Sequence, residues 1–93
     1  MADIELTRSH SMGLDGGRAA VERVAQQLES DLEVDYAWDD DTLRFEGAGA
    51  DGTIKVEADA VRVALNLSAF LRPLQSRVEE EAAEYLDQHL DGA

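Results

Sequence analysis

The sequence predicts an α+β domain in which an antiparallel sheet of about five strands has two amphipathic helices packed on one face. Each expected strand alternates apolar with polar residues, so one face is suited to burial and the other to water. Each expected helix carries a single apolar stripe, which needs a partner to bury it. The expected order is β-α-β-β-β-β-α, and a chain of 93 residues is expected to form one domain, residues 1–93.

The first strand and the first helix follow from two different periodicities. Apolar and polar residues alternate from Ile4 to Thr7, which predicts a half-buried strand over residues 3–9. Residues 12–31 carry apolar side chains at helical spacing on one side and charged or polar ones on the other. This pattern predicts an amphipathic helix.

Two further strands are expected in the middle of the chain. Tyr36 and Trp38 share one face of the first of them. Leu43 and Phe45 share a face of the second, and the acidic residues 39–41 between the strands suit a tight turn. Asp favours such turns because its side chain hydrogen-bonds nearby backbone and tolerates left-handed geometry.

The last two strands and a closing helix complete the prediction. Apolar and polar side chains alternate over residues 54–58 and 61–67. The connectors at residues 47–52 and 59–60 are short enough for hairpins, which favours antiparallel pairing. Residues 70–90 carry the second amphipathic pattern, with acidic residues on its outer side.

The stretch SHSMGLDGG at residues 9–17 is interpreted as the junction between the first strand and the first helix. Neighbouring residues of a strand point to opposite faces, so a catalytic contact between Ser9 and His10 is not expected. Ser11 precedes the helical stripe, where a hydroxyl caps free backbone N–H groups, and Asp15 is the competing cap.

Two other interpretations of this stretch stay open. The start of the helix could contact an anion through Ser11 and Gly13, because the amides and the dipole of a helix N-terminus favour negative charge. The second interpretation is a hydrolase site built on Ser9, His10 and Ser11, although the sequence does not place the third member of a catalytic triad beside them. The glycines match neither the phosphate-loop pattern nor the dinucleotide-binding pattern.

The charge balance excludes one large class of partner. The chain has 21 acidic and 8 basic residues, a formal net charge of −13, so phosphate backbones repel it and no nucleic-acid binding is expected. The chain has no cysteine, no apolar run long enough for membrane insertion and no signal-peptide pattern, so a cytoplasmic protein is expected. The acidic surface is interpreted as a device for solubility or a salty cytoplasm, with a basic partner as the alternative.

Neither a metal nor a cofactor is expected. The acidic turn at residues 39–41 lacks the glycine and the distal glutamate of a calcium loop. His10 and His89 lack the spacing of a zinc site. Glu79, Glu80 and Glu81 point in different directions on a helix, so they cannot converge on one substrate atom, and no catalytic residue is assigned.

The aromatic residues have two interpretations. Tyr36, Trp38, Phe45, Phe70 and Tyr85 are expected on the inner faces as core residues. If the sheet and the C-terminal helix leave a gap, these side chains would line it, and Trp38, Tyr36, Phe45 and Tyr85 are then the expected ligand contacts.

The order and spacing of several segments resemble a known family. The segments are HSMGLDGGRAAVERVAQQL, VDYAWDDDTLRFEGAGADGTIKVEADAVRVAL and LSAFLRPLQSRVEEEAAEYLDQHL, and they cover nearly the whole chain. The chain resembles the small polyhydroxyalkanoic acid system proteins, described as regulators of the granule region in bacterial polyester storage. The resemblance implies a setting near polyester synthesis and storage, with storage granules as a further location, and it carries no catalytic residues across.

These observations support two hypotheses of function. The first is a small soluble, non-enzymatic accessory or regulatory protein that contacts a protein partner of the storage system. Its expected contact surface is the acidic helical face formed by Glu79, Glu80, Glu84 and Asp87. The second is a binding protein for an acyl or hydroxyacyl compound, held between the sheet and the C-terminal helix. The apolar stripes are expected to be fully committed to the core, and an exposed edge strand would allow a homodimer.

Overall fold

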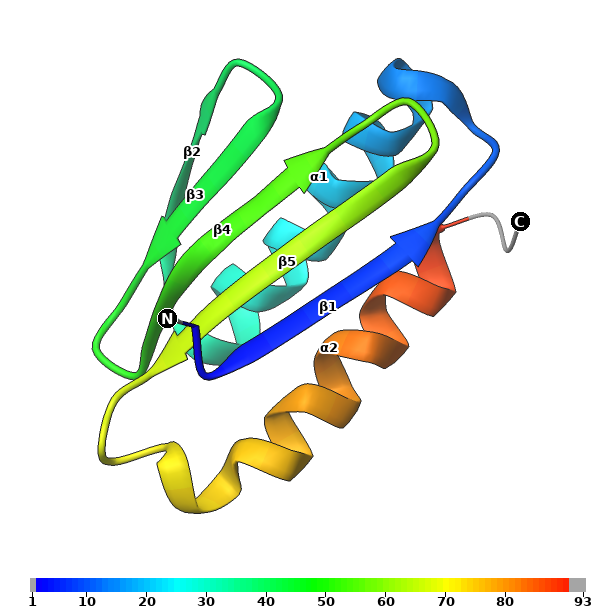
Figure 1. Cartoon of the computed structure of the whole chain (residues 1–93). Coiled ribbons are helices and arrows are strands. Elements are labelled where there is room, and N and C mark those ends of the chain that lie inside the picture. Colours follow the sequence, from blue (N-terminus) through cyan, green and yellow to red (C-terminus); the bar gives the residue numbers. More distant parts are fainter. Residues whose placement is uncertain (1, 91–93) are drawn as a thin grey trace.

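The computed structural model describes residues 2–90, and within them the chain forms a five-stranded antiparallel sheet and two α-helices. The predicted fold class and order of elements are therefore confirmed. The strands lie in the order β1-β5-β4-β3-β2, so the first and last strands of the chain are neighbours (Figure 1). The elements are β1 (Ile4–Ser9), α1 (Gly13–Leu32), β2 (Asp35–Asp39), β3 (Thr42–Glu46), β4 (Ala50–Val56), β5 (Ala60–Leu67), the short 3-10 helix η1 (Arg72–Leu74) and α2 (Gln75–His89).

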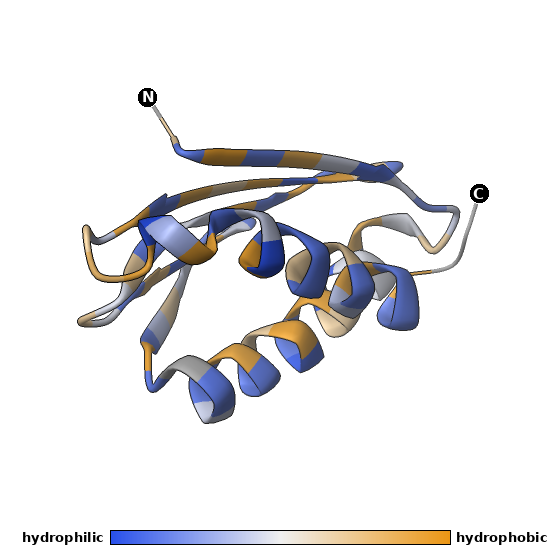
Figure 2. Cartoon of the chain, turned by 90° about the horizontal axis from the view of Figure 1, so that it is seen from below, coloured by the Kyte–Doolittle hydropathy of each residue, from blue (hydrophilic) through white to orange (hydrophobic). Residues whose placement is uncertain are grey.

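The molecule has two layers, with both helices on the same side of the sheet (Figure 2). The apolar side of each strand faces the helices, and the other side of the sheet is left uncovered, as the alternation of the strands requires. The two layers are held together by burial of apolar side chains. The largest side chains that are fully buried are those of Ile4, Val21, Val34, Leu43, Ile54, Val61 and Leu86.

The turn between β2 and β3 forms as predicted. Asp39 ends β2 and Thr42 begins β3, so Asp40 and Asp41 make the connection. Asp40 has a φ of 58°, in the left-handed region that Asp tolerates better than most residues.

The start of α1 differs from the prediction. In the described part of the chain Met12 is the N-cap residue, and its side chain makes no capping hydrogen bond, so neither Ser11 nor Asp15 is the cap. Gly13 follows with a φ of 73°, a conformation that favours glycine. The imidazole of His10 takes part in the junction instead, because its Nδ1 accepts a hydrogen bond from the Met12 amide at 3.2 Å.

The C-terminal helix is shorter than predicted, and this exposes apolar residues. Pro73 lies in the first turn of η1, where its missing N–H costs no hydrogen bond, and the α-helix begins only at Gln75. Phe70 therefore lies in the connector after β5, where its side chain is 82% exposed, and Leu74 is 50% exposed. The expectation that Phe70 belongs to the core and that all apolar stripes are internal was wrong.

The β3–β4 connector is also shorter than predicted, because Ala50, Asp51 and Gly52 belong to β4. A Cβ atom at Gly52 would lie 2.1 Å from the backbone carbonyl oxygen of Ala64 on β5. That distance is far below van der Waals contact, so the close approach of β4 and β5 requires glycine at this position.

Candidate functional site

The end of the molecule where β5 leads into α2 carries an exposed apolar cluster beside acidic residues. The β3–β4 turn, the C-terminal end of α1 and the β5–η1 connector lie at this end of the sheet (Figure 1). They border a shallow hollow of about 520 Å³, which we call the Phe70 hollow. It is lined by Ser30, Asp31, Glu33, Ala48, Gly49, Phe70 and Leu71.

The walls of the Phe70 hollow are fixed by backbone features. A Cβ atom at Gly49 would lie 2.7 Å from Cδ1 of Leu71, so Leu71 packs directly on the bare glycine backbone. Glu33 caps the C-terminus of α1 with a φ of 54°, in a position that glycine commonly occupies. The last turn of α1 has no basic residue, so the carboxylates of Asp31 and Glu33 stand at the negative end of the helix dipole.

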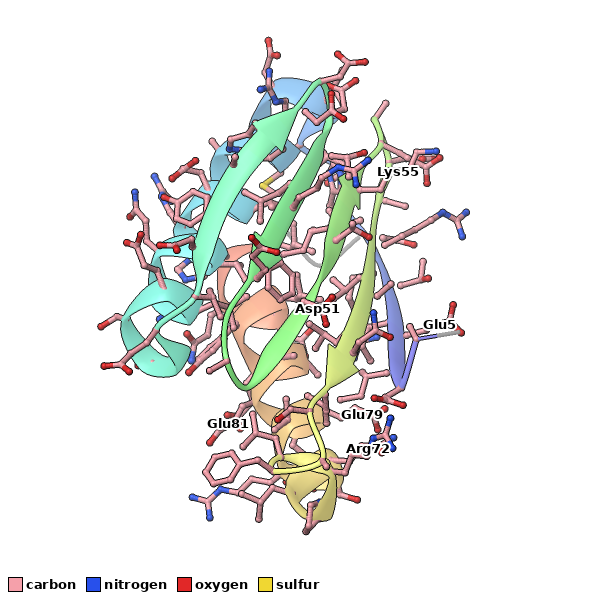
Figure 3. The ribbon with its side chains drawn as sticks, turned by 90° about the vertical axis from the view of Figure 1, so that its left-hand side faces the viewer. Glu5, Asp51, Lys55, Arg72, Glu79 and Glu81 are labelled. Atoms are coloured by element: carbon pink, nitrogen blue, oxygen red, sulfur yellow. The ribbon has the colours of Figure 1, made fainter. Side chains whose placement is uncertain are left out.

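The acidic face lies on α2, the helix that follows the Phe70 connector in the chain. Glu79, Glu80, Glu84 and Asp87 are all exposed, as the contact hypothesis requires. Among the described residues Asp87 alone of these four makes an ion pair, with Arg8 on β1 at 3.3 Å. Figure 3 shows Glu79 near Arg72 of η1 and Glu81 on the other side of α2, at the end of the molecule opposite Lys55.

The uncovered face of the sheet forms a second candidate surface. It contains a shallow hollow of about 500 Å³, whose floor is made of small residues from neighbouring strands. The residues that line it are Asp35, Tyr36, Ala37, Arg44, Phe45, Glu46, Asp51, Gly52, Thr53, Ala64 and Asn66.

The strand register places like charges opposite one another on this face. Asp35 of β2 pairs with Glu46 of β3, and Glu46 pairs in turn with Asp51 of β4. At the other end of the same face Lys55 of β4 pairs with Arg62 of β5, and Figure 3 shows Asp51 and Lys55 well separated. Like charges directly opposite each other on a sheet are destabilising, by about 0.2–1 kcal/mol for each pair.

A neighbouring carboxylate reduces the repulsion between Lys55 and Arg62, whereas in the described part of the chain the acidic row of Asp35, Glu46 and Asp51 has no basic neighbour of this kind. The Arg62 guanidinium lies 2.7 Å from the Glu57 carboxylate, and its hydrogen bond lowers the pKa of that carboxyl. Arg44 pairs with Asp39 at 3.6 Å. Within the described residues neither Asp35, Glu46 nor Asp51 has a basic side chain within 4.0 Å.

Tyr36 and Trp38, two of the expected ligand contacts, bind α1 instead. The Tyr36 hydroxyl donates to Glu22 at 2.5 Å, and the Trp38 indole N–H donates to the same carboxylate at 2.8 Å. These hydrogen bonds, that from Tyr36 first, lower the pKa of Glu22. The Arg18 guanidinium lies 4.8 Å from the centre of the Trp38 ring, a cation–π distance. The cluster ties the edge strand β2 to the helix.

The space between the sheet and the helices is small. It measures about 30 Å³, which corresponds to a single water molecule. Tyr85 lines it and donates a hydrogen bond from its hydroxyl to Asp31 of α1. Of the four aromatic residues of the ligand hypothesis, only Tyr85 lines this space. Tyr36 of β2 lies opposite Phe45 of β3 on the side of the sheet that faces the helices, where Phe45 is buried and Tyr36 is bonded to α1. The remaining lining residues are Val24, Leu28, Ala50, Ile54, Val63, Leu65, Val78, Glu81, Ala82 and Leu86.

His10 is a buried residue whose ring nitrogens are both used by backbone groups. Its side chain is 2% exposed, Nδ1 accepts from the Met12 amide, and Nε2 lies 3.0 Å from the Glu57 carbonyl oxygen. This pairing requires the neutral tautomer with its proton on Nε2. Ser9 and Ser11 are exposed. The ring therefore holds the junction together, and neither nitrogen is available as a catalytic base.

The expected anion contact at the start of α1 lies on the surface. Ser11 and Gly13 are both exposed, and Asp15 adds a carboxylate to the first helical turn. That carboxylate competes with an external anion for the positive end of the helix. Across residues 2–90 no three His, Asp or Glu side chains gather as a metal site, and neither helix in that range is long and apolar enough to span a membrane.

Sequence reasoning missed the Phe70 hollow. Phe70 was expected on an inner face, in a helix over residues 70–90, whereas the structure places it in the connector before η1 and α2.

The comparison with known proteins gives one match. The sequence model of the family described as "Putative polyhydroxyalkanoic acid system protein (PHA_gran_rgn)" matches residues 4–90. No curated protein and no solved structure matches the chain.

Proposed function

Because the chain belongs to this polyhydroxyalkanoic acid system family, we propose that it is a non-enzymatic accessory protein of polyester storage that acts by binding a protein partner. The observation that carries the proposal is the row of exposed carboxylates on α2, at Glu79, Glu80, Glu84 and Asp87. A surface of this kind favours a basic partner and repels nucleic acid and anionic membranes. We place the protein in the cytoplasm, at storage granules that display the partner.

Two exposed apolar residues in the segment that leads into α2 also support protein binding. Protein interfaces commonly combine a few apolar or aromatic anchors with a polar rim. Phe70 and Leu74 supply apolar anchors, and the α2 carboxylates supply polar contacts for a basic partner. Burying one such side chain at an interface contributes about 1.5–3 kcal/mol.

The test is co-sedimentation of the full chain with polyester granules from a producing cell. We expect the protein to travel with intact granules at low salt, to be released at high salt, and to ignore granules stripped of their surface proteins. The variant E79K, E80K, E84K, D87K should lose this association. A control variant with the same change in net charge on other exposed positions, E5K, D15K, E29K, D59K, should keep it.

Three outcomes contradict the proposal. Binding to stripped granules would mean direct adsorption on the polyester. Equal loss in both charge variants would mean that net charge alone is responsible. Failure to sediment with intact granules at any salt concentration would remove the granule from the proposal.

The second candidate function is the binding of an acyl or hydroxyacyl compound between the sheet and α2. The apolar lining of that space favours it, but a volume of about 30 Å³ holds no acyl chain. Binding would require α2 to move away from α1 and break the Tyr85–Asp31 hydrogen bond. The test is to add a hydroxyacyl compound and to measure the unfolding temperature of the wild type and of Y85F. If both temperatures rise equally and the α2 resonances do not change, the compound does not bind at this site.

A further inference from the structure

The Phe70 hollow combines an aromatic wall with negative charge. Phe70 is 82% exposed, and no described part of the chain covers its ring, although an aromatic side chain is among the costliest to leave in water. Asp31 and Glu33 line the same hollow, at the C-terminal end of α1. An aromatic face beside carboxylates and helix carbonyl groups is complementary to a cation with a flat apolar surface.

Among protein groups, the arginine side chain fits this description best. Its guanidinium is planar, stacks on aromatic rings and pairs with carboxylates, and it is less strongly hydrated than a lysine ammonium group. A phosphate or another anionic ligand is disfavoured by Asp31 and Glu33. A second copy of this chain is disfavoured by the net charge of −13 on each copy.

We infer that the Phe70 hollow is a docking site for an arginine side chain of a protein partner, which stacks on Phe70 and pairs with Asp31 and Glu33. The inference deepens the proposed function, because it names the chemistry by which the partner is recognised. It also assigns the anchor to the hollow, while the acidic face of α2 attracts the same basic partner through longer-range charge.

The geometry of the hollow supports a preformed site. Leu71 rests on the backbone of Gly49, which fixes the connector that carries Phe70. The backbone of that connector is held by hydrogen bonds from the Leu71 and Arg72 amides to the Ser68 carbonyl oxygen, at 2.9 and 3.0 Å. A preformed hollow loses less conformational entropy on binding than a mobile loop does.

The probe for the test is a hexa-arginine peptide, with a hexalysine peptide as the comparison, added to the isotopically labelled full chain. We expect the amide resonances of Ala48, Gly49, Phe70 and Leu71 to shift, with tighter binding of the arginine peptide. F70A should weaken that binding about fivefold or more, the range that one cation–π contact supplies when partly desolvated. F70W should retain it, because the aromatic face is kept.

Matched variants separate this site from general charge attraction. L14A removes a partly exposed apolar side chain outside the hollow and should leave the affinity unchanged. E33Q and E79Q change the net charge equally, and only E33Q should weaken the preference for arginine over lysine. Circular dichroism of each variant establishes that the fold is intact.

Other outcomes overturn the inference. Three results would each show that the Phe70 hollow is not an arginine site. They are equal affinity of F70A and the wild type, equal binding of the two peptides, and resonance shifts confined to α2 or to the uncovered sheet face. Self-association of the chain that F70A abolishes would assign the hollow to a second copy instead. If the peptide test fails while α2-dependent granule binding persists, the proposed function stands without this site. If the arginine peptide binds the hollow but the protein does not associate with granules, the arginine site stands and the proposed function falls.

Discussion

The imidazole Nε2 of His10 and the backbone carbonyl oxygen of Glu57 lie 3.0 Å apart, and this hydrogen bond joins two segments 47 positions apart in the chain. The backbone adds a second link, because the His10 amide donates to the Asp59 carbonyl oxygen at 3.0 Å. The junction between β1 and α1 is thereby attached to the β4–β5 hairpin. The histidine that the sequence presents beside two serines is a structural residue.

We expect His10→Ala to lower the free energy of unfolding by about 2–4 kcal/mol, because it leaves a cavity and two backbone groups without their partner. Urea unfolding followed by circular dichroism measures the change. His89→Ala is the control, since His89 is half-buried and its side chain contacts Gln27. A loss no larger than that of His89→Ala would contradict the role of His10.

Gly52→Ala should destabilise the sheet by about 2 kcal/mol or more, because the added Cβ would meet the Ala64 backbone and force β4 and β5 apart. The neighbouring variant Thr53→Ala changes a side chain on the uncovered face and should have a much smaller effect. Thermal unfolding of both variants checks this, and equal melting temperatures would show that the strands adjust without cost.

Glu46→Lys should stabilise the protein by about 0.5–1 kcal/mol, because it replaces two like-charge pairs with Asp35 and Asp51 by two attractive ones. The gain should shrink as salt is added, since surface charges are screened. Denaturant titrations at low and high salt measure it. A destabilised variant, or a gain independent of salt, would show that the row of carboxylates is not repulsive.

The Glu22 cluster should contribute stability that is lost in acid. Hydrogen bonds from Tyr36 and Trp38 hold the pKa of Glu22 below its ordinary value, about 4.3 in an unfolded chain. The folded state therefore binds a proton less readily, so this contribution is complete above that value and declines as the pH falls through the folded pKa. Glu22→Gln should flatten this part of the profile, measured by Trp38 fluorescence; an unchanged slope would contradict it.

Two tyrosines should make the fold sensitive to alkali. Hydrogen bonding to Glu22 raises the pKa of Tyr36 to about 12, and hydrogen bonding to Asp31 raises the pKa of Tyr85 to about 12. Stability from these groups is present below their unfolded pKa, about 10, and falls as the pH rises from there through about 12. In the double variant Y36F, Y85F this decline should disappear from unfolding curves. A decline equal to that of the wild type would assign it to other groups.

Much of the fold could be predicted because its signals are local. The alternation within β1 to β5 and the helical stripe of α1 come from neighbouring residues, and the turn at Asp40 follows from the tolerance of Asp for left-handed backbone. The cap of α1 was wrong for the opposite reason. The group that contacts the Met12 amide is the His10 ring, whose position depends on the distant carbonyl group of Glu57.

The candidate site was predicted only in part. The exposure of Glu79, Glu80, Glu84 and Asp87 follows from helical spacing alone. The exposure of Phe70 depends on where α2 begins, and a local apolar pattern does not decide between a helical stripe and a connector.

The sequence by itself determined the types of the elements, the one-sided burial of the sheet, the negative charge and the family. These properties are set by periodicity and composition, which are complete in the chain before it folds. Only the tertiary structure decided that β1 pairs with β5, that Asp35, Glu46 and Asp51 form one row, and that Phe70 borders a hollow with Asp31 and Glu33. The reason is that strand register and the packing of distant segments join residues whose proximity no local pattern encodes.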